Sequence, residues 1–215
     1  TPRGNGHAVI DGQHRAMAAI MHPGVLEVPC WIVEAPDVHA QAEVFIGVNR
    51  DRNLIQPLQL HKAQLAAEEP EALHVDAVCR EAGVTLAYNL QGAGTLPPRQ
   101  TQAVSTIRKL LSMYGDAPVR QALKTLVDAY PDTPNQLRGQ TIMAVTALYF
   151  RYPDRIDQER LTKILGERNC EDLTEGARAI KKTMGGSTHA SLVEALVRAY
   201  DRGLLPHRRL HKAAA

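Results

Sequence analysis

The stretch VIDGQHRAMAAI, residues 9–20, decides how the first part of the chain is interpreted. Apolar residues lead into Asp11-Gly12, then into Gln13-His14-Arg15, and then into a run of small and apolar residues typical of a helix. This pattern predicts a short strand over residues 7–11 and a helix over 13–21. His22-Pro23-Gly24 ends the helix, because proline cannot continue it and glycine tolerates the turn. Polar and charged side chains are therefore expected at the corner between a strand and a helix.

The chemistry of this corner is suited to an anion. A helix that begins directly after a strand presents unpaired backbone N–H groups and the positive end of its dipole. Gly12 lets a phosphate approach the backbone, Arg15 offers a planar fork of donors, and His14 adds another donor. Asp11 can cap the helix, hold a metal, or pair with Arg15. The corner is interpreted either as an anion site or as a capped turn.

Outward from the corner, the pattern continues as an α/β unit. The apolar run VPCWIV, residues 28–33, predicts a buried strand in which Cys30 and Trp31 are packing residues. Asp37 is expected to cap a helix over residues 38–49. Ligands commonly bind where the strands of such units end.

A second polar cluster lies in VNRDRNLIQP, residues 48–57. Asn49 or Asp51 could hold a metal there, and Arg52 could contact a phosphate. The alternative is a polar helix C-terminus, at which arginines are favoured by the helix dipole.

The rest of the chain is predicted to be helical. Residues 84–98 contain glycine and proline but no charge, and they are predicted to link a first domain, 1–83, to a helical domain, 99–215. The expected fold class is therefore α+β. The tail LPHRRLHKAAA is basic and expected to be frayed. The predicted helices cover residues 58–67, 70–81, 100–114, 117–130, 136–152, 158–167, 173–183 and 189–201.

Composition and charge narrow the class of protein. Hydrophobic residues make up 44% and charged residues 22%, which is typical of a globular protein. No apolar run is long enough to span a membrane, no signal peptide is visible, and the three cysteines form no CxxC pair, so a cytoplasmic protein without a membrane partner is expected. Residues 1–98 hold 6 Lys/Arg and 11 Asp/Glu, whereas residues 99–215 hold 19 and 12. The basic half is interpreted either as facing DNA or as a set of solvated helices.

Together and in order, these features resemble the N-terminal domain of the ParB/sulfiredoxin superfamily. That family has a glycine-plus-arginine box of the type GERRxxA, then an apolar strand, then a helix ending in ENxxRxxxxP. Gly12-Gln13-His14-Arg15 stands at the first box, Val28-Pro29-Cys30-Trp31 at the strand, and Val48–Arg52 with Pro57 at the second box. The DGQHR spelling is similar to ParB-like domains of phage and actinobacterial proteins and of DNA-modification gene clusters. The resemblance covers residues 6 to about 65.

The resemblance implies a nucleotide site in this small mixed α/β domain. It assigns phosphate contacts to the first box, Gly12, Gln13, His14 and Arg15, and metal or phosphate contacts to Asn49 and Arg52. The implied ligand is a nucleoside triphosphate, CTP or ATP, with Mg²⁺; a homodimer is left open. The family's opening strand and helix would precede Thr1, so the domain is expected to be N-terminally incomplete.

Two departures from the family's pattern limit the expected chemistry. Gln13 stands where sulfiredoxins carry a catalytic cysteine, so sulfinic acid reduction is not expected. Val48 stands where ParB proteins that hydrolyse CTP carry an acidic residue. Nucleotide binding without turnover is therefore expected. An enzyme on the same fold, a phosphotransferase or nuclease with Asp11 and Asp51 as its acid/base or metal groups, is the alternative. An interaction scaffold with a vestigial pocket is a further alternative.

The basic half contains only weak motifs. The segment 158–181 is the best candidate for a DNA-binding helix-turn-helix, but Thr162, Asp172 and Glu175 fall where small or apolar residues are expected. His207 and His211 have the spacing of metal ligands on a helix, but no third ligand is apparent. Binding of DNA through this half therefore rests on charge alone.

Overall fold

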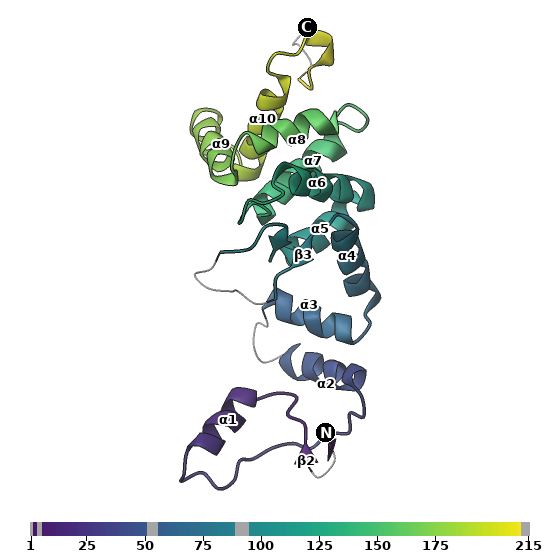
Figure 1. Cartoon of the computed structure of the whole chain (residues 1–215), viewed down its shortest axis with the longest axis vertical. Helices are drawn as coiled ribbons and strands as arrows, with labels where there is room; N and C mark the ends of the chain where they lie inside the picture. Colours follow the sequence, from purple (N-terminus) through teal and green to yellow (C-terminus); the bar gives the residue numbers. More distant parts are fainter. Residues whose placement is uncertain (1, 4–5, 51–55, 89–94, 212–215) are drawn as a thin grey trace. The chain divides into compact units, whose positions relative to one another are not determined.

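The computed structural model of the chain describes residues 2–3, 6–50, 56–88 and 95–211 (Figure 1). The chain divides into two compact units, Thr1–Leu73 and His74–Ala215, called here the N-terminal unit and the C-terminal unit. This division precedes the predicted end of the first domain at residue 83. Among the described residues, no helix combines the length and the apolar character needed to cross a membrane.

The N-terminal unit is mostly helical. Its helices are α1 (Gln13–Met21), α2 (Val38–Arg50), α3 (Pro57–Ala66) and the first turn of α4 (Pro70–Glu81). These helices confirm the sequence prediction, and α2 packs against α3. The Asp37 carboxylate accepts a hydrogen bond from the Ala40 amide at 2.8 Å, so the predicted cap is also confirmed.

The predicted mixed sheet of the N-terminal unit does not form among the described residues. Its strands are β1 (Pro2–Arg3) and β2 (Gly6–His7), which pair antiparallel, and residues 8–11 and 28–33 lie outside any strand. The prediction of a buried strand over 28–33 is wrong: Cys30 is exposed and Trp31 is 94% exposed. A strand is stable only with a partner, and Pro29 removes one of the donors that a partner would use.

The C-terminal unit begins with a small parallel pairing. Strand β3 (Thr85–Leu86) pairs with β4 (Gln100–Thr101), and Leu86 is buried. Part of the segment 84–98, predicted to be a linker, therefore belongs to the folded unit. Residues 89–94 lie outside the described residues.

Six helices follow, and every one was predicted. They are α5 (Val104–Tyr114), α6 (Asp116–Ala129), α7 (Gly139–Arg151), α8 (Gln158–Gly166), α9 (Cys170–Met184) and α10 (Thr188–Asp201).

Helix α7 lies at the centre of this unit because its sequence, GQTIMAVTALYFR, carries no charge before its last residue. A helix that is apolar on all sides is buried on all sides. Helices α5, α6 and α10 pack around it, α8 packs on α6, and α9 packs on α10. Ile142 and Leu148 of α7 are fully buried.

The C-terminal tail is ordered up to residue 211, so the expectation of fraying is wrong there. After α10 comes a short 3₁₀ turn, η1 (Pro206–Arg208), and Leu210 is only 2% exposed. The side chain of Asp201 accepts hydrogen bonds from the amides of Leu210 and His211. A buried leucine and a buried carboxylate thus hold a segment whose composition alone predicts disorder.

Candidate functional site

The predicted corner is centred on Gly12, whose backbone has φ 80° and ψ 22°. This left-handed conformation is one that glycine adopts without strain and that most residues avoid. Helix α1 begins at the next residue, as predicted. Its first turn has no side-chain cap and no acidic residue. The N–H groups of this turn therefore remain available to an anion.

Arg15 lies beside Gly12. A Cβ atom built on Gly12 would meet the Arg15 guanidinium at 3.1 Å, so glycine leaves room for this side chain. The Arg15 guanidinium is 3.7 Å from the Asp11 carboxylate, and the arginine side chain is 85% exposed. Exposed ion pairs of this kind contribute at most about 1 kcal/mol. A phosphate can therefore replace Asp11 as the partner of Arg15 at little cost.

The other residues of the first box lie at the surface. His14 is exposed at the start of α1, and the Gln13 amide donates to the Val9 carbonyl at a long 3.4 Å. Asp11, Gly12, His14 and Arg15 thus lie together at one helix start. The sequence pattern predicted this grouping, although the predicted strand before it does not form.

The position of the second polar cluster, Asn49, Asp51 and Arg52, relative to the corner at Gly12 is not described. Asn49 lies in the last turn of α2, where only its backbone is described, and Asp51 and Arg52 lie outside the described residues. Within the described part of the chain, no group of three His, Cys, Asp or Glu side chains could hold a metal ion. The predicted metal site at Asn49 stays a prediction.

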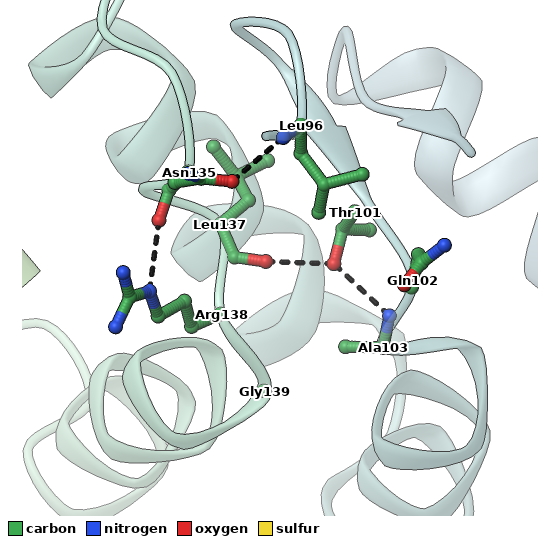
Figure 2. A pocket seen from close by; sticks show the side chains of 8 residues that line it. All are labelled: Leu96, Thr101, Gln102, Ala103, Asn135, Leu137, Arg138 and Gly139. Carbon is green, nitrogen blue, oxygen red and sulfur yellow. Dashed lines mark hydrogen bonds between the residues drawn. The ribbon is translucent and has the colours of Figure 1, made fainter. Parts of the chain in front are cut away.

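A separate cavity of about 380 Å³ lies in the C-terminal unit, between the starts of α5 and α7 (Figure 2). The Thr101 hydroxyl donates to the Leu137 carbonyl at 2.7 Å and accepts from the Ala103 amide at 3.1 Å. The Asn135 carboxamide oxygen accepts from the Leu96 amide at 2.7 Å. The bonds of Thr101 to Leu137 and of Asn135 to Leu96 join β4 and the segment before it to the turn that precedes α7.

Arg138, at the edge of this cavity, also has bonding partners within the protein. Its Nε donates to the Asn135 carbonyl at 3.1 Å, and its guanidinium pairs with Glu171 of α9 at 3.0 Å (Figure 2 shows the first of these bonds). The side chains of Thr101, Asn135 and Arg138 therefore bond to backbone groups around the cavity, and Arg138 also bonds to Glu171. We therefore assign the cavity a structural role, and the corner at Gly12 remains the candidate site.

The cysteines of the C-terminal unit are not nucleophiles in this arrangement. Burial, reinforced by Asp76, raises the pKa of Cys79 to about 12. Burial also raises the pKa of Cys170, against the hydrogen bond from Thr141 and the charge of Arg138. A thiol that stays protonated is a poor nucleophile and a poor metal ligand.

The candidate helix-turn-helix does not have the expected packing. Asn169 begins α9 with a capping box, in which its side chain accepts from the Glu171 and Asp172 amides. Helix α9 packs on α10 instead of folding back on α8, and Asp172 and Glu175 are exposed. The candidate recognition motif over 158–181, whose fit to the sequence was already poor, therefore finds no support in the packing.

Sequence reasoning missed one polar cluster. Glu194 and Asp201 of α10 lie on either side of the His211 ring, within 3.1 Å and 3.0 Å of its two nitrogens. The i, i+4 spacing of His207 and His211 drew attention to a different pairing. No sequence signal identifies the cluster, because it depends on how the chain turns back after α10.

Comparisons with known proteins found no matching family model, no similar curated protein and no similar solved structure.

Proposed function

We propose that this chain is a ParB-like, nucleotide-binding and DNA-associated protein of the cytoplasm. Its DGQHR corner binds the phosphates of a nucleoside triphosphate, CTP or ATP, with Mg²⁺, and its helical C-terminal unit binds DNA or a partner, which includes a second copy of the chain. The observation that carries the proposal is the left-handed Gly12 at an uncapped helix start, with the Arg15 guanidinium beside it.

Each residue of the corner has a distinct role in this proposal. Gly12 lets a phosphate oxygen approach the first-turn amides of α1. Arg15 leaves Asp11 and donates two parallel hydrogen bonds to the phosphate. Gln13 and His14 add further donors at the rim. Asn49 and Arg52 would complete the site by holding the metal and a second phosphate.

The nucleotide part is tested by calorimetric titration of the whole chain with CTP and with ATP, each with and without Mg²⁺. Arg15→Ala should weaken the affinity by about 10- to 100-fold, because a charge-assisted hydrogen bond is lost. Gly12→Ala should also weaken it, because φ 80° is strained for alanine and its Cβ would crowd the guanidinium.

Lys62→Ala is the matched control, since it removes one exposed positive charge from α3 in the same unit. Absence of binding, or equal losses in Arg15→Ala and Lys62→Ala, would refute the phosphate corner. Turnover of a nucleotide or nucleic acid that disappears in Asp11→Asn would instead establish the enzyme alternative.

A further inference from the structure

The segment that follows α10, residues 202–211, is unusually basic. Its sequence RGLLPHRRLH holds three arginines, two histidines and no acidic residue. In Figure 1 it is the yellow segment that leads from α10 towards the C label. We call it the C-terminal hook. Its charge matters only if its shape is defined, and three sets of contacts define it.

The first set is made by Asp201, the last residue of α10, which is 8% exposed. One carboxylate oxygen accepts from the Leu210 amide at 2.6 Å. The other accepts from the His211 amide and from its ring Nδ1, both at 3.0 Å. The end of the hook is therefore held back against the helix from which it leaves.

The second set places His211 between two carboxylates. Its Nδ1 faces Asp201 and its Nε2 faces Glu194 at 3.1 Å. A carboxylate only accepts hydrogen bonds, so each ring nitrogen of His211 faces an acceptor. Glu194, Asp201 and His211, called here the triad, close the hook over the last turns of α10.

The third set binds the backbone of the hook. Arg160 of α8 donates to the Tyr200 carbonyl at 2.8 Å and to the Arg202 carbonyl at 2.6 Å. Arg155, which follows α7, donates to the Arg209 carbonyl. Carbonyls of the hook thus accept hydrogen bonds from arginines of α8 and of the segment between α7 and α8.

The arginines of the hook itself remain exposed. Arg202 and Arg208 make no ion pair or side-chain hydrogen bond within residues 95–211, and Arg209 only donates its Nε to the Leu204 carbonyl at 2.9 Å. Beside them lies a hollow of about 360 Å³, whose lining includes Arg202, Arg209 and a single acid, Asp201. Arginines outnumber carboxylates in this lining, and Asp201 already accepts hydrogen bonds from two backbone amides, so the hollow presents mainly positive charge.

We infer that the C-terminal hook is a nucleic-acid contact surface that holds the phosphate backbone of DNA with Arg202, Arg208 and Arg209. This deepens the proposed function by naming the surface for its DNA-associated part, and it rests on that part alone. The planar guanidinium group of arginine matches the geometry of phosphate oxygens. Because the hook is already ordered, little conformational entropy is lost when its arginines bind. Phosphate contacts carry no direct sequence information, so this binding should be independent of DNA sequence.

The alternative polyanion is an anionic membrane, and the hook fits it less well. Peripheral membrane segments bury an apolar face beside their basic residues. The only large exposed apolar side chain of the hook is Leu205, because Leu210 points into the protein. Nucleic acid needs no such face.

The test measures binding of a fluorescent DNA duplex of mixed sequence to the whole chain over a series of salt concentrations. Each phosphate contact contributes about 0.9 to the slope of log K against log salt. The triple variant Arg202→Gln/Arg208→Gln/Arg209→Gln should therefore lower the slope by about 2 to 3. Arg202→Gln/Arg208→Gln leaves every described hydrogen bond of the hook intact and should lower it by about 2.

The matched control removes the same charge elsewhere in the C-terminal unit. Lys163, Arg178 and Lys182, on α8 and α9, are exposed, and their replacement by Gln should leave most of the slope in place. Equal losses in the two triple variants would mean that net charge, and not the hook, binds DNA, and would overturn the inference. Binding of phosphatidylserine vesicles but not of DNA, lost in the same variants, would overturn it as well.

Order in the hook is tested separately by Asp201→Asn, a positioning variant. It removes a negative charge, so binding by charge alone would become stronger. If the defined shape of the hook matters, binding becomes weaker and hydrogen exchange of the Leu210 amide becomes faster. Stronger binding would overturn the role of an ordered hook.

The experiments separate the nucleotide site at Gly12 from the DNA surface of the hook, so either proposal can be refuted without the other. Nucleotide affinity should be unchanged in the hook variants, and DNA affinity should be unchanged in Arg15→Ala. If the unmodified chain binds nucleotide but does not bind DNA, the hook proposal is refuted and the nucleotide site at Gly12 is unaffected.

Discussion

The two units of the chain are both built from helices, yet they differ in what they bury. Among the described residues, the buried apolar side chains of the N-terminal unit are all alanines: Ala35, Ala42, Ala67 and Ala72. Those of the C-terminal unit include many leucines, valines and isoleucines, and Leu123, Ile142 and Leu196 are fully buried. Large apolar side chains are present in the N-terminal unit too, but Leu26 is 91% and Trp31 94% exposed. Helical pattern alone therefore does not tell how well a helix is anchored.

The three cysteines give the largest expected contrast between the units. Cys30 is exposed in the N-terminal unit, whereas Cys79 and Cys170 are buried in the other. Ellman's reagent at pH 8 should modify one thiol at once and the other two slower by a factor on the order of 10³ or more, since buried groups react only after opening. The raised pKa of Cys79, about 12, slows its reaction further because little thiolate forms. Cys30→Ser should remove the fast phase, and three fast thiols would abolish the contrast.

A matched pair of leucine truncations gives the next largest effect. Leu123→Ala removes a fully buried side chain from α6 and should lower the free energy of unfolding by about 2–5 kcal/mol. Leu26→Ala makes the same change at an exposed position and should alter it by less than about 0.5 kcal/mol. Urea unfolding followed by circular dichroism measures both. Similar losses from the two substitutions would show that Leu26 is buried in solution.

The helix caps compare the units at a smaller scale. Asn169→Ala removes the acceptor of the Glu171 and Asp172 amides at the start of α9 and should cost about 1 kcal/mol in the main unfolding transition. Asp37→Ala removes the cap of α2 and should lower helix content in the native state more than it shifts that transition. The transition is followed by near-ultraviolet circular dichroism of the tyrosines, all of which lie in the C-terminal unit. An equal shift from both variants would mean that the units unfold together.

The smallest expected effect is that of low pH on the stability of the C-terminal hook. Burial opposes ionisation of Glu194, but hydrogen bonds from Arg198 and His211 outweigh it, so the pKa of Glu194 lies below its usual 4.5. The resulting stabilisation is complete above pH 4.5 and is lost as the pH falls through the lowered pKa. Hydrogen exchange of the Leu210 amide should accelerate modestly in that range. Glu194→Gln should flatten the acceleration, whereas Glu159→Gln on α8 should not; an unchanged profile in Glu194→Gln would remove Glu194 from the triad.

The helices and the corner at Gly12 could be predicted from the sequence because interactions between neighbouring residues determine them. His22-Pro23-Gly24 predicted the end of α1, because proline and glycine act on the backbone next to them. Gly12 could likewise be singled out before its φ was known, since a glycine at a helix start lets a phosphate approach the backbone closely. Such features depend on neighbours within one or two turns.

The strand over 28–33 could not be decided locally. An apolar run with valine, tryptophan and isoleucine is compatible with a buried strand, but a strand also needs a partner that the run itself does not specify. The tail shows the opposite error: its composition predicts fraying, yet Leu210 is buried and Asp201 binds the chain that returns to it. Both errors concern contacts between residues that the local pattern does not relate.

What the sequence determined by itself was therefore the set of helices, the cap of α2, the stop of α1 and a glycine–arginine corner at the start of α1, because hydrogen bonding and backbone preference act over a few residues. What only the tertiary structure decided was which apolar side chains are buried, which pairing the segment 84–98 makes with β4, and where three arginines of the tail are held. Burial, strand pairing and ion triads join distant residues, and their free energy exists only after the chain has folded.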